Sequence, residues 1–159
     1  MIVSMWMTRN VATIGPDASV AEAAALMARK RVRRLPVAEK HGTEVRLLGM
    51  ISASDILHAF PPDVNPFAVE APEERQGAMT TGEIMNRQIE TTTPATPIEE
   101  AAATMRDRKI GALPVIHEGR MVGLITESDI FRAIVSLFSL PGKGVRITFD
   151  MNFLDEAGS

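Results

Sequence analysis

The sequence contains no cysteine, no tyrosine and a single tryptophan among its 159 residues. Without cysteine the chain has no disulfide bond, no thiolate metal ligand and no cysteine nucleophile. Because aromatic residues make up only 4% of the sequence, the core must be built from aliphatic side chains, alanine and the ten methionines. Hydrophobic residues still account for 45% of the chain, which is enough for a buried core and argues against disorder.

Membrane-spanning and targeting segments are also missing. No stretch approaches the ~18 consecutive apolar residues that a membrane-spanning helix needs. The chain begins with MIVSMWMTR, which lacks the basic segment and the long apolar run of a signal peptide. The net charge of −3 gives no basic footprint of the kind that nucleic-acid-binding proteins carry. We therefore expect a soluble cytoplasmic protein that contacts neither membrane nor nucleic acid.

The sequence shows no catalytic or metal-binding constellation. Its three histidines, His41, His58 and His117, are scattered over expected turns and one helix end, which favours surface positions over a metal triad. There is no glycine-rich phosphate loop of the Walker or Rossmann type and no Gly-x-Ser-x-Gly motif. We therefore expect no enzymatic activity, no metal site and no required cofactor.

What the sequence does contain is an internal repeat. Residues 110–129 read IGALPVIHEGRMVGLITESD, two apolar runs around a polar turn, which predicts a β-hairpin followed by a helix. Residues 32–55 repeat this pattern, with the triplet Leu-Pro-Val starting at Leu35 and again at Leu113. The offset between the copies is 78 residues up to these triplets and 74 residues after them. We place the four-residue difference in a longer first hairpin loop, around residues 40–44.

An amphipathic helix is expected before each hairpin. Apolar residues recur at helical spacing in both copies, as Val20, Ala23, Ala24 and Met27 and as Ile98, Ala101, Ala102 and Met105. A capping box should start each helix, from Ser19 to Glu22 and from Thr96 to Glu99, with Pro97 at the first helical position. Short strands are expected ahead of these helices at 12–14 and 91–93, and further helices after the hairpins at about 52–60 and 127–138.

Three segments lie outside the repeated pattern. Residues 3–7 are apolar and are expected to form one helical turn that packs on the body. Residues 61–77 hold four prolines and an acidic bias, which is typical of an exposed linker. Residues 145–151 alternate between apolar and polar side chains, which predicts one half-buried strand, either added to the body or exchanged in a dimer. The division is therefore 3–60, first repeat; 61–77, linker; 78–139, second repeat; and 140–159, C-terminal strand and tail.

These motifs resemble the CBS domain family. Each unit reads strand, helix, strand, strand, helix, with the Leu-Pro-Val triplet and an ending of the form Gly-apolar-apolar-(Ser/Thr)-x-x-Asp. The pair resembles a tandem CBS (Bateman) module. The resemblance implies an α+β fold in which two β-α-β-β-α repeats pack sheet against sheet about a pseudo-twofold axis. It further implies two clefts for adenosine-containing ligands, such as AMP, ADP, ATP, NAD or S-adenosylmethionine, and association into a homodimer.

The resemblance also assigns roles to matched positions. Ser52 with Asp55, and Thr126 with Asp129, match the family element in which the Asp accepts from ribose hydroxyls and the Ser or Thr meets ribose or phosphate. A carboxylate can accept hydrogen bonds from both cis hydroxyls of a ribose. The same spacing is a capping box with Asp in place of Glu, so we expect the capping role at both places, with the ligand role in addition.

The residues ahead of the Leu-Pro-Val triplets, Arg34 and Ala112, face the ligand cleft in the family. Ala112 leaves room for a base, whereas Arg34 would meet a phosphate as a bidentate donor. Alternatively, residues 29–34 form only a solvated basic turn. Positions that touch the base in the family are matched by Asn10, Ala12, Gln88 and Glu90. The acidic Glu90 disfavours a nearby phosphate, and the difference between Arg34 and Ala112 predicts two unequal sites.

Three classes of function follow from this pattern. The first is a non-enzymatic regulatory module that senses adenine nucleotides and, through differential binding to two conformations, acts on an unknown regulated protein. The second is a structural dimerisation or docking scaffold with vestigial nucleotide sites, which Arg34 and Glu90 favour. The third is an enzyme, which would need a base or nucleophile constellation that the sequence does not offer.

Overall fold

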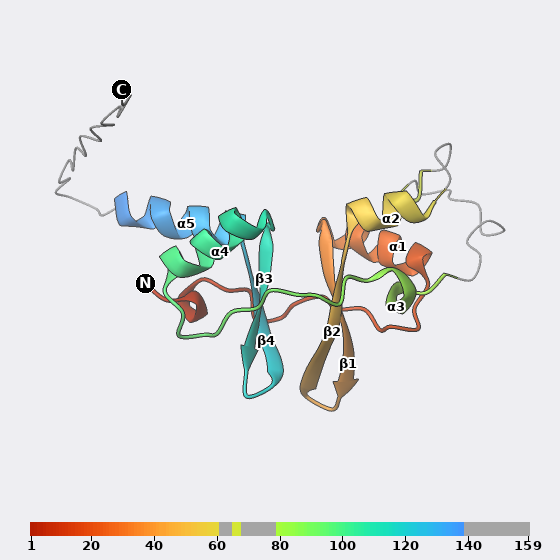
Figure 1. Ribbon diagram of the computed structural model, residues 1–159, viewed down its shortest axis with the longest axis horizontal. Helices are drawn as coiled ribbons and strands as arrows, with labels where there is room; N and C mark the ends of the chain where they lie inside the picture. Colours follow the sequence, from red (N-terminus) through yellow and green to blue (C-terminus); the bar gives the residue numbers. More distant parts are fainter. Residues whose placement is uncertain (61–64, 68–78, 139–159) are drawn as a thin grey trace, which may run out of the picture.

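The computed structural model describes residues 1–60, 65–67 and 79–138 (Figure 1). The strand expected at 145–151 lies outside the described residues, as does most of the expected linker. The chain runs in order through a 3-10 helix η1 (Val3–Met5), α1 (Val20–Lys30), β1 (Arg34–His41), β2 (Glu44–Ser52), α2 (Ala53–Ala59), α3 (Thr81–Ile84), α4 (Ile98–Arg108), β3 (Ala112–His117), β4 (Arg120–Thr126) and α5 (Glu127–Phe138). Within the described residues, no helix has the length and apolar character needed to cross a membrane.

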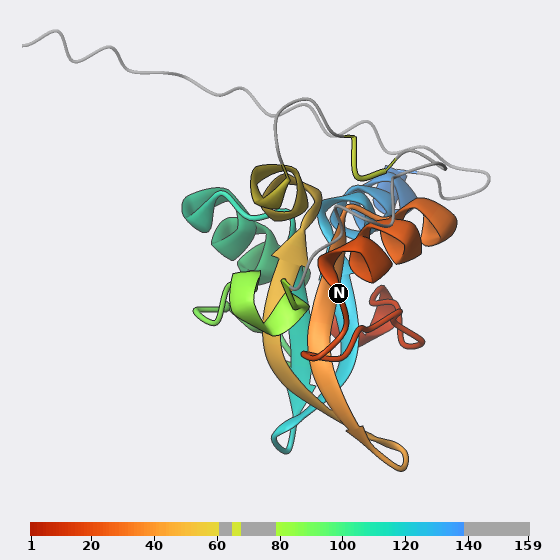
Figure 2. The ribbon, with the colours of Figure 1, turned by 90° about the vertical axis from the view of Figure 1, so that its right-hand side faces the viewer.

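Two antiparallel hairpins form the centre of the molecule. β1 pairs with β2, β3 pairs with β4, and β2 and β4 contact each other, so that the two small sheets meet in the middle (Figure 1). The helices α1, α2, α4 and α5 gather at one end of the hairpins and the two hairpin tips project from the other, as Figure 2 shows from the side. This arrangement confirms the expected α+β fold, built from two repeats of similar sequence.

The expectation of a longer first hairpin loop is wrong. Both hairpins close with two residues, at 42–43 and 118–119, each containing a glycine at positive φ. β1 and β2 instead have eight and nine residues, where β3 and β4 have six and seven. Lengthening each strand by two residues preserves the alternation of side chains between the two faces, so the insertion changes neither the buried face nor the turn.

The strands expected at 12–14 and 91–93 shrink to single bridging residues, Ile14 and Thr92. Ile14 donates its N–H to Pro36 O at 3.0 Å and accepts from Ala38 N at 2.9 Å. In a parallel ladder the next bonds would need N–H groups on Pro36 and on Pro16, and proline has none. Pro114 and Pro94 occupy the equivalent places around Thr92. The prolines therefore stop both ladders after one residue.

The helix α1 forms as the sequence predicts. Ser19 Oγ accepts from Glu22 N at 3.1 Å and Glu22 Oε2 accepts from Ser19 N at 2.7 Å, which completes the capping box. The buried residues of the helix are the four expected ones, Val20, Ala23, Ala24 and Met27. The small alanines let α1 lie close to the sheet.

The capping box expected at Thr96 is wrong. Pro97 is the N-cap of α4 and makes no side-chain capping bond, so the helix begins at Ile98. Thr96 is then one residue too far from the helix to cap it, and its Oγ1 accepts from Thr93 N at 3.2 Å instead. The buried face is still as expected at Ile98, Ala101 and Met105.

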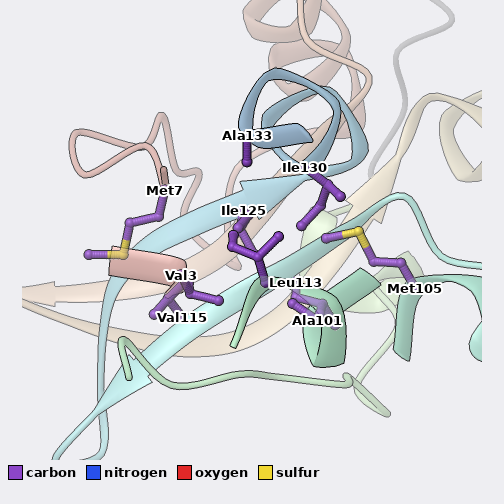
Figure 3. Packing of buried hydrophobic residues seen from close by; sticks show 10 residues of the cluster. Val3, Met7, Ala101, Met105, Leu113, Val115, Ile125, Ile130 and Ala133 are labelled. Carbon is purple, nitrogen blue, oxygen red and sulfur yellow. The ribbon is translucent and has the colours of Figure 1, made fainter. Parts of the chain in front are cut away.

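Each core is completed by the first residues of the other repeat. The helical turn expected at the N-terminus is present as η1. Val3 and Met7 lie in the core of the second repeat with Leu113, Val115 and Ile125 (Figure 3). Conversely, the short α3 lies on the side of α1 and α2, and its neighbour Met85 lies in the core of the first repeat (Figure 1). This exchange ties the repeats into one unit and fixes the clefts between them.

Candidate ligand-binding clefts between the repeats

The hairpin register places the predicted site residues opposite one another. Arg34, the first residue of β1, pairs with Ser52 at the end of β2, and Ala112 pairs with Thr126 in the same way. The backbone extends this junction, because Ala53 N donates to Arg33 O at 2.9 Å, and Glu127 N donates to Gly111 O at 3.2 Å. Each helix start is thus fastened to the segment that enters the hairpin, and both junctions face the middle of the molecule.

A small cleft of about 250 Å³ brings six of the ten predicted residues together: Arg34, Ser52, Asp55, Gln88, Glu90 and Ala112. Both repeats contribute, together with the segment between α3 and α4. The apolar side chains of Ile89 and Ile110 also line this cleft, which we call the small cleft. Its walls therefore combine an apolar surface with two carboxylates, two amides and a guanidinium.

The Ser52–Asp55 pair caps α2, as expected. Asp55 Oδ2 accepts from both the N–H and the hydroxyl of Ser52, each at 2.7 Å, and Asp55 N donates to Ser52 Oγ at 3.2 Å. The other carboxylate oxygen, Oδ1, has no hydrogen-bond partner among the described residues. Since Asp55 lines the small cleft and is only partly buried, it retains an acceptor for a ligand.

The Thr126–Asp129 pair also caps its helix, but its carboxylate differs. Asp129 Oδ2 accepts from Thr126 N at 2.9 Å and from Thr126 Oγ1 at 2.7 Å. Asp129 Oδ1 is paired with the guanidinium of Arg132, and the residue is only 4% exposed. Each oxygen therefore already has a partner, and Asp129 lines neither the small cleft nor the two described next.

A larger cleft of about 630 Å³ adjoins the small cleft and shares Arg34, Ser52 and Ala112 with it. We call it the arginine cleft, because Arg31 and Arg33 line it as well. The predicted residue Thr126 lies here, with hydroxyls from the starts of α2 and α5. The sequence predicts either a solvated basic turn at residues 29–34 or a phosphate contact at Arg34, and it does not indicate that three arginines line one space.

The remaining two predicted residues, Asn10 and Ala12, lie in a third cleft of about 700 Å³, which we call the outer cleft. Arg9, Lys30 and Lys40 also line it, and it shares no lining residue with the small cleft or the arginine cleft. The structure therefore does not bring Asn10 and Ala12 together with the other eight. Among the described residues, no group of three or more His, Asp or Glu side chains is arranged to hold a metal ion.

Comparisons with known proteins agree with the fold. The CBS domain family matches the chain at residues 3–62 and again at 82–136. A CBS domain pair, that of protein MJ0100, was solved with 5′-methylthioadenosine and S-adenosyl-L-methionine; it is 25% identical and superposes with a TM-score of 0.68 over 86% of this chain and 98% of that one. The structure of CBSX2 in complex with AMP is also 25% identical, with a TM-score of 0.69 over 86% of this chain and 97% of that chain.

A relative with an enzyme name shares only part of its length with this chain. The homoserine O-acetyltransferase of Methanohalobium evestigatum is 32% identical over 133 residues, which is 83% of this chain but 24% of that protein. The chain thus spans about a quarter of this relative. The shared quarter is the length of a CBS pair, so the similarity does not carry the acetyltransferase activity with it.

Proposed function

Because the chain belongs to the CBS domain family, of which it carries two copies, we propose that it is a non-enzymatic regulatory module that binds an adenosine-containing ligand between its repeats. The small cleft is the proposed site, and Asp55 is the proposed ribose acceptor. Ligand binding would favour one of two arrangements of the repeats and so change the affinity for a regulated protein. The size of this change is limited by the difference in the ligand's affinity for the two arrangements.

The composition of the small cleft carries this proposal. Ile89 and Ile110 offer apolar surface for a flat base, Gln88 offers an amide for its polar edge, and Asp55 Oδ1 offers the acceptor that a pair of ribose hydroxyls needs. The similar CBS pairs solved with AMP or with S-adenosyl-L-methionine support the same ligand class. Asp129 is the weaker candidate, because its carboxylate is committed to Thr126 and Arg132.

The alternative function is a docking scaffold with vestigial sites. An aspartate with an unpaired carboxylate oxygen, lining the same cleft as two isoleucines, favours binding over this alternative. A third possibility, an enzyme, would require a nucleophile or a base with an orienting partner, and the residues lining the small cleft do not supply one.

Titration of the purified protein tests the proposal directly. AMP, ATP, NAD and S-adenosylmethionine are added one at a time in a calorimeter. We expect at least one of the four to bind with micromolar affinity. Bound ligand should be recovered unchanged, because no turnover is proposed. If a folded protein gives no binding heat with any of the four, the scaffold alternative replaces the sensor.

We also propose that two copies associate through the exposed apolar faces of α2 and α5. On α5, Phe131 and Phe138 are 67% and 74% exposed, and on α2, Leu57 is 52% exposed. Leu57 and Phe131 are equivalent positions of the two repeats, 74 residues apart. Each copy therefore carries an apolar position on both α2 and α5. In a twofold dimer, the α2 and α5 faces of one copy can be covered by the same two helices of the other copy.

Replacing Phe131 by a charged residue should separate the proposed dimer. We expect Phe131→Glu to convert a dimer into a monomer in sedimentation or light-scattering measurements at micromolar protein, because a carboxylate would be buried unpaired in the interface. Glu39→Gln, on the hairpin away from these helices, is the matched control and should remain dimeric. A wild-type protein that is monomeric at these concentrations would contradict the proposal.

A further inference from the structure

We infer that the ligand of the small cleft carries an oligophosphate chain, as a nucleoside di- or triphosphate does, and that Arg31, Arg33 and Arg34 hold this chain in the arginine cleft. The inference rests on the proposed function and names the class of ligand within it. 5′-Methylthioadenosine has no anionic group to place in the arginine cleft, and the 5′ substituent of S-adenosylmethionine brings only one carboxylate, beside its sulfonium and ammonium cations.

The sizes of the two clefts support a ligand in two parts. The small cleft, at about 250 Å³, lies below the range of roughly 300–1,000 Å³ that is usual for pockets holding a complete small molecule. It has room for a nucleoside. The adjoining arginine cleft adds about 630 Å³, and the shared residues Arg34, Ser52 and Ala112 form the border between the two. A nucleoside in the small cleft can therefore extend its 5′ substituent past Ser52 into the larger space.

The charges of the arginine cleft select an anion for that space. Three guanidinium groups line it against a single carboxylate, that of Glu127. Among the described residues, none of these three guanidinium groups lies within salt-bridge distance of a carboxylate. The ion pairs in this part of the chain all involve other cationic side chains. Each guanidinium offers several N–H donors in a planar fork that fits two phosphate oxygens at once.

The second repeat makes room for these arginines. At the positions equivalent to Arg33 and Arg34 it carries Gly111 and Ala112. A Cβ on Gly111 would lie 2.8 Å from Arg34 Nη1 and 2.9 Å from Glu127 Oε2, so the glycine lets these two side-chain ends lie where they do. One repeat supplies the charges and the other supplies small residues. The arrangement therefore forms a single oligophosphate site at the centre of the molecule rather than one in each repeat.

Glu90, which the sequence alone marks as unfavourable to phosphate, does not oppose this assignment. Its carboxylate Oε1 lies 3.2 Å from Arg108 Nε, so the negative charge is paired within the second repeat. Glu90 lines the small cleft but not the arginine cleft. The phosphate chain and this carboxylate thus occupy different parts of the site.

Calorimetric titration of the full chain with ATP, ADP, AMP, adenosine and S-adenosylmethionine tests the inference. We expect ATP to bind most tightly, and Arg31→Ala or Arg33→Ala to weaken ATP about tenfold each, since a hydrogen bond to a charged group contributes enough for about that factor. Adenosine affinity should change much less in the same two variants. Tripolyphosphate should compete with ATP in the wild-type protein. Arg29→Ala is the matched control, an exposed arginine of α1 that lines none of the three clefts.

The possible failures can be told apart. Equal affinity for ATP and adenosine, or tighter binding of S-adenosylmethionine than of ATP, would overturn the oligophosphate inference and leave the proposed function standing. Loss of adenosine binding together with ATP binding in the Arg31 variant would also overturn it, because the arginine would then act on the whole site. No binding of any of the five compounds would overturn the proposed function as well.

Discussion

Asp55→Asn should weaken binding of the adenosine ligand by about 10- to 100-fold, the factor expected when a charged acceptor loses one or two hydrogen bonds. The substitution changes little else. Asn keeps one side-chain oxygen, which can still accept from Ser52 as Asp55 Oδ2 does at 2.7 Å. The second oxygen becomes an NH₂ group, which cannot accept from a ribose hydroxyl. Calorimetric titration of folded wild-type and variant protein measures the change.

The matched control for this prediction is the equivalent substitution in the other repeat. Asp129 has the same spacing to its cap residue, but its carboxylate is buried at 4% exposure and paired with Arg132. We therefore expect Asp129→Asn to leave ligand affinity within about threefold, although it can lower stability by breaking that pair. If Asp129→Asn abolishes binding while Asp55→Asn does not, the ribose is bound by Asp129 of the second repeat, and the assignment to Asp55 is wrong.

The second large effect concerns stability. Gly49→Val should lower the free energy of unfolding by about 3 kcal/mol, near the upper end of the usual range for overpacking a core. A Cβ on Gly49 would lie 2.5 Å from Met85 Sδ and 3.0 Å from Asn86 O. Met85 is buried in the core of the first repeat, and Asn86 N and O both bond to Met50 at the edge of β2. The substitution therefore pushes the exchanged segment off the sheet.

Urea unfolding of Gly49→Val beside Gly15→Ala measures this effect. Gly15 has no heavy atom within 4 Å of its Cβ position, so Gly15→Ala should be neutral or slightly stabilising. Adding Met85→Ala to Gly49→Val should cost less than the sum of the single changes, because the two side chains compete for the same space. A loss below about 1 kcal/mol for Gly49→Val would mean that the exchanged segment is not part of the core.

Local patterns in the sequence predict the local structure well. The buried face of α1, its capping box at Ser19, and the caps at Ser52 and Thr126 all follow from spacing within four residues, and the structure has each of them. The cap expected at Thr96 fails because Pro97 itself becomes the N-cap, which moves the helix start one residue onward. The expected first strands fail because prolines remove the N–H groups that would extend them. That second failure is readable in the sequence, from Pro16 and Pro36.

Contacts between distant segments could not be predicted in the same way. Residues 6–8 and 84–86 occupy equivalent positions in the two repeats, so the sequence does not say which core receives which segment. The structure exchanges them, as Met7 and Met85 show. The different partners of Asp55 and Asp129 could not be predicted either. Asp129 is paired with Arg132, which lies outside the motif that the two repeats share. Likewise, the three arginines gather around one space only when the hairpins are packed.

In the proposed function the small cleft holds the nucleoside of an adenosine ligand, with its ribose on Asp55. The most direct measurement is a crystal structure of the protein with the ligand that binds most tightly in the titrations. We predict that the ribose hydroxyls lie within hydrogen-bond distance of Asp55 and that the base lies between Ile89 and Ile110. A ligand bound instead beside Thr126 and Asp129, or in the outer cleft with Asn10 and Ala12, would contradict the account.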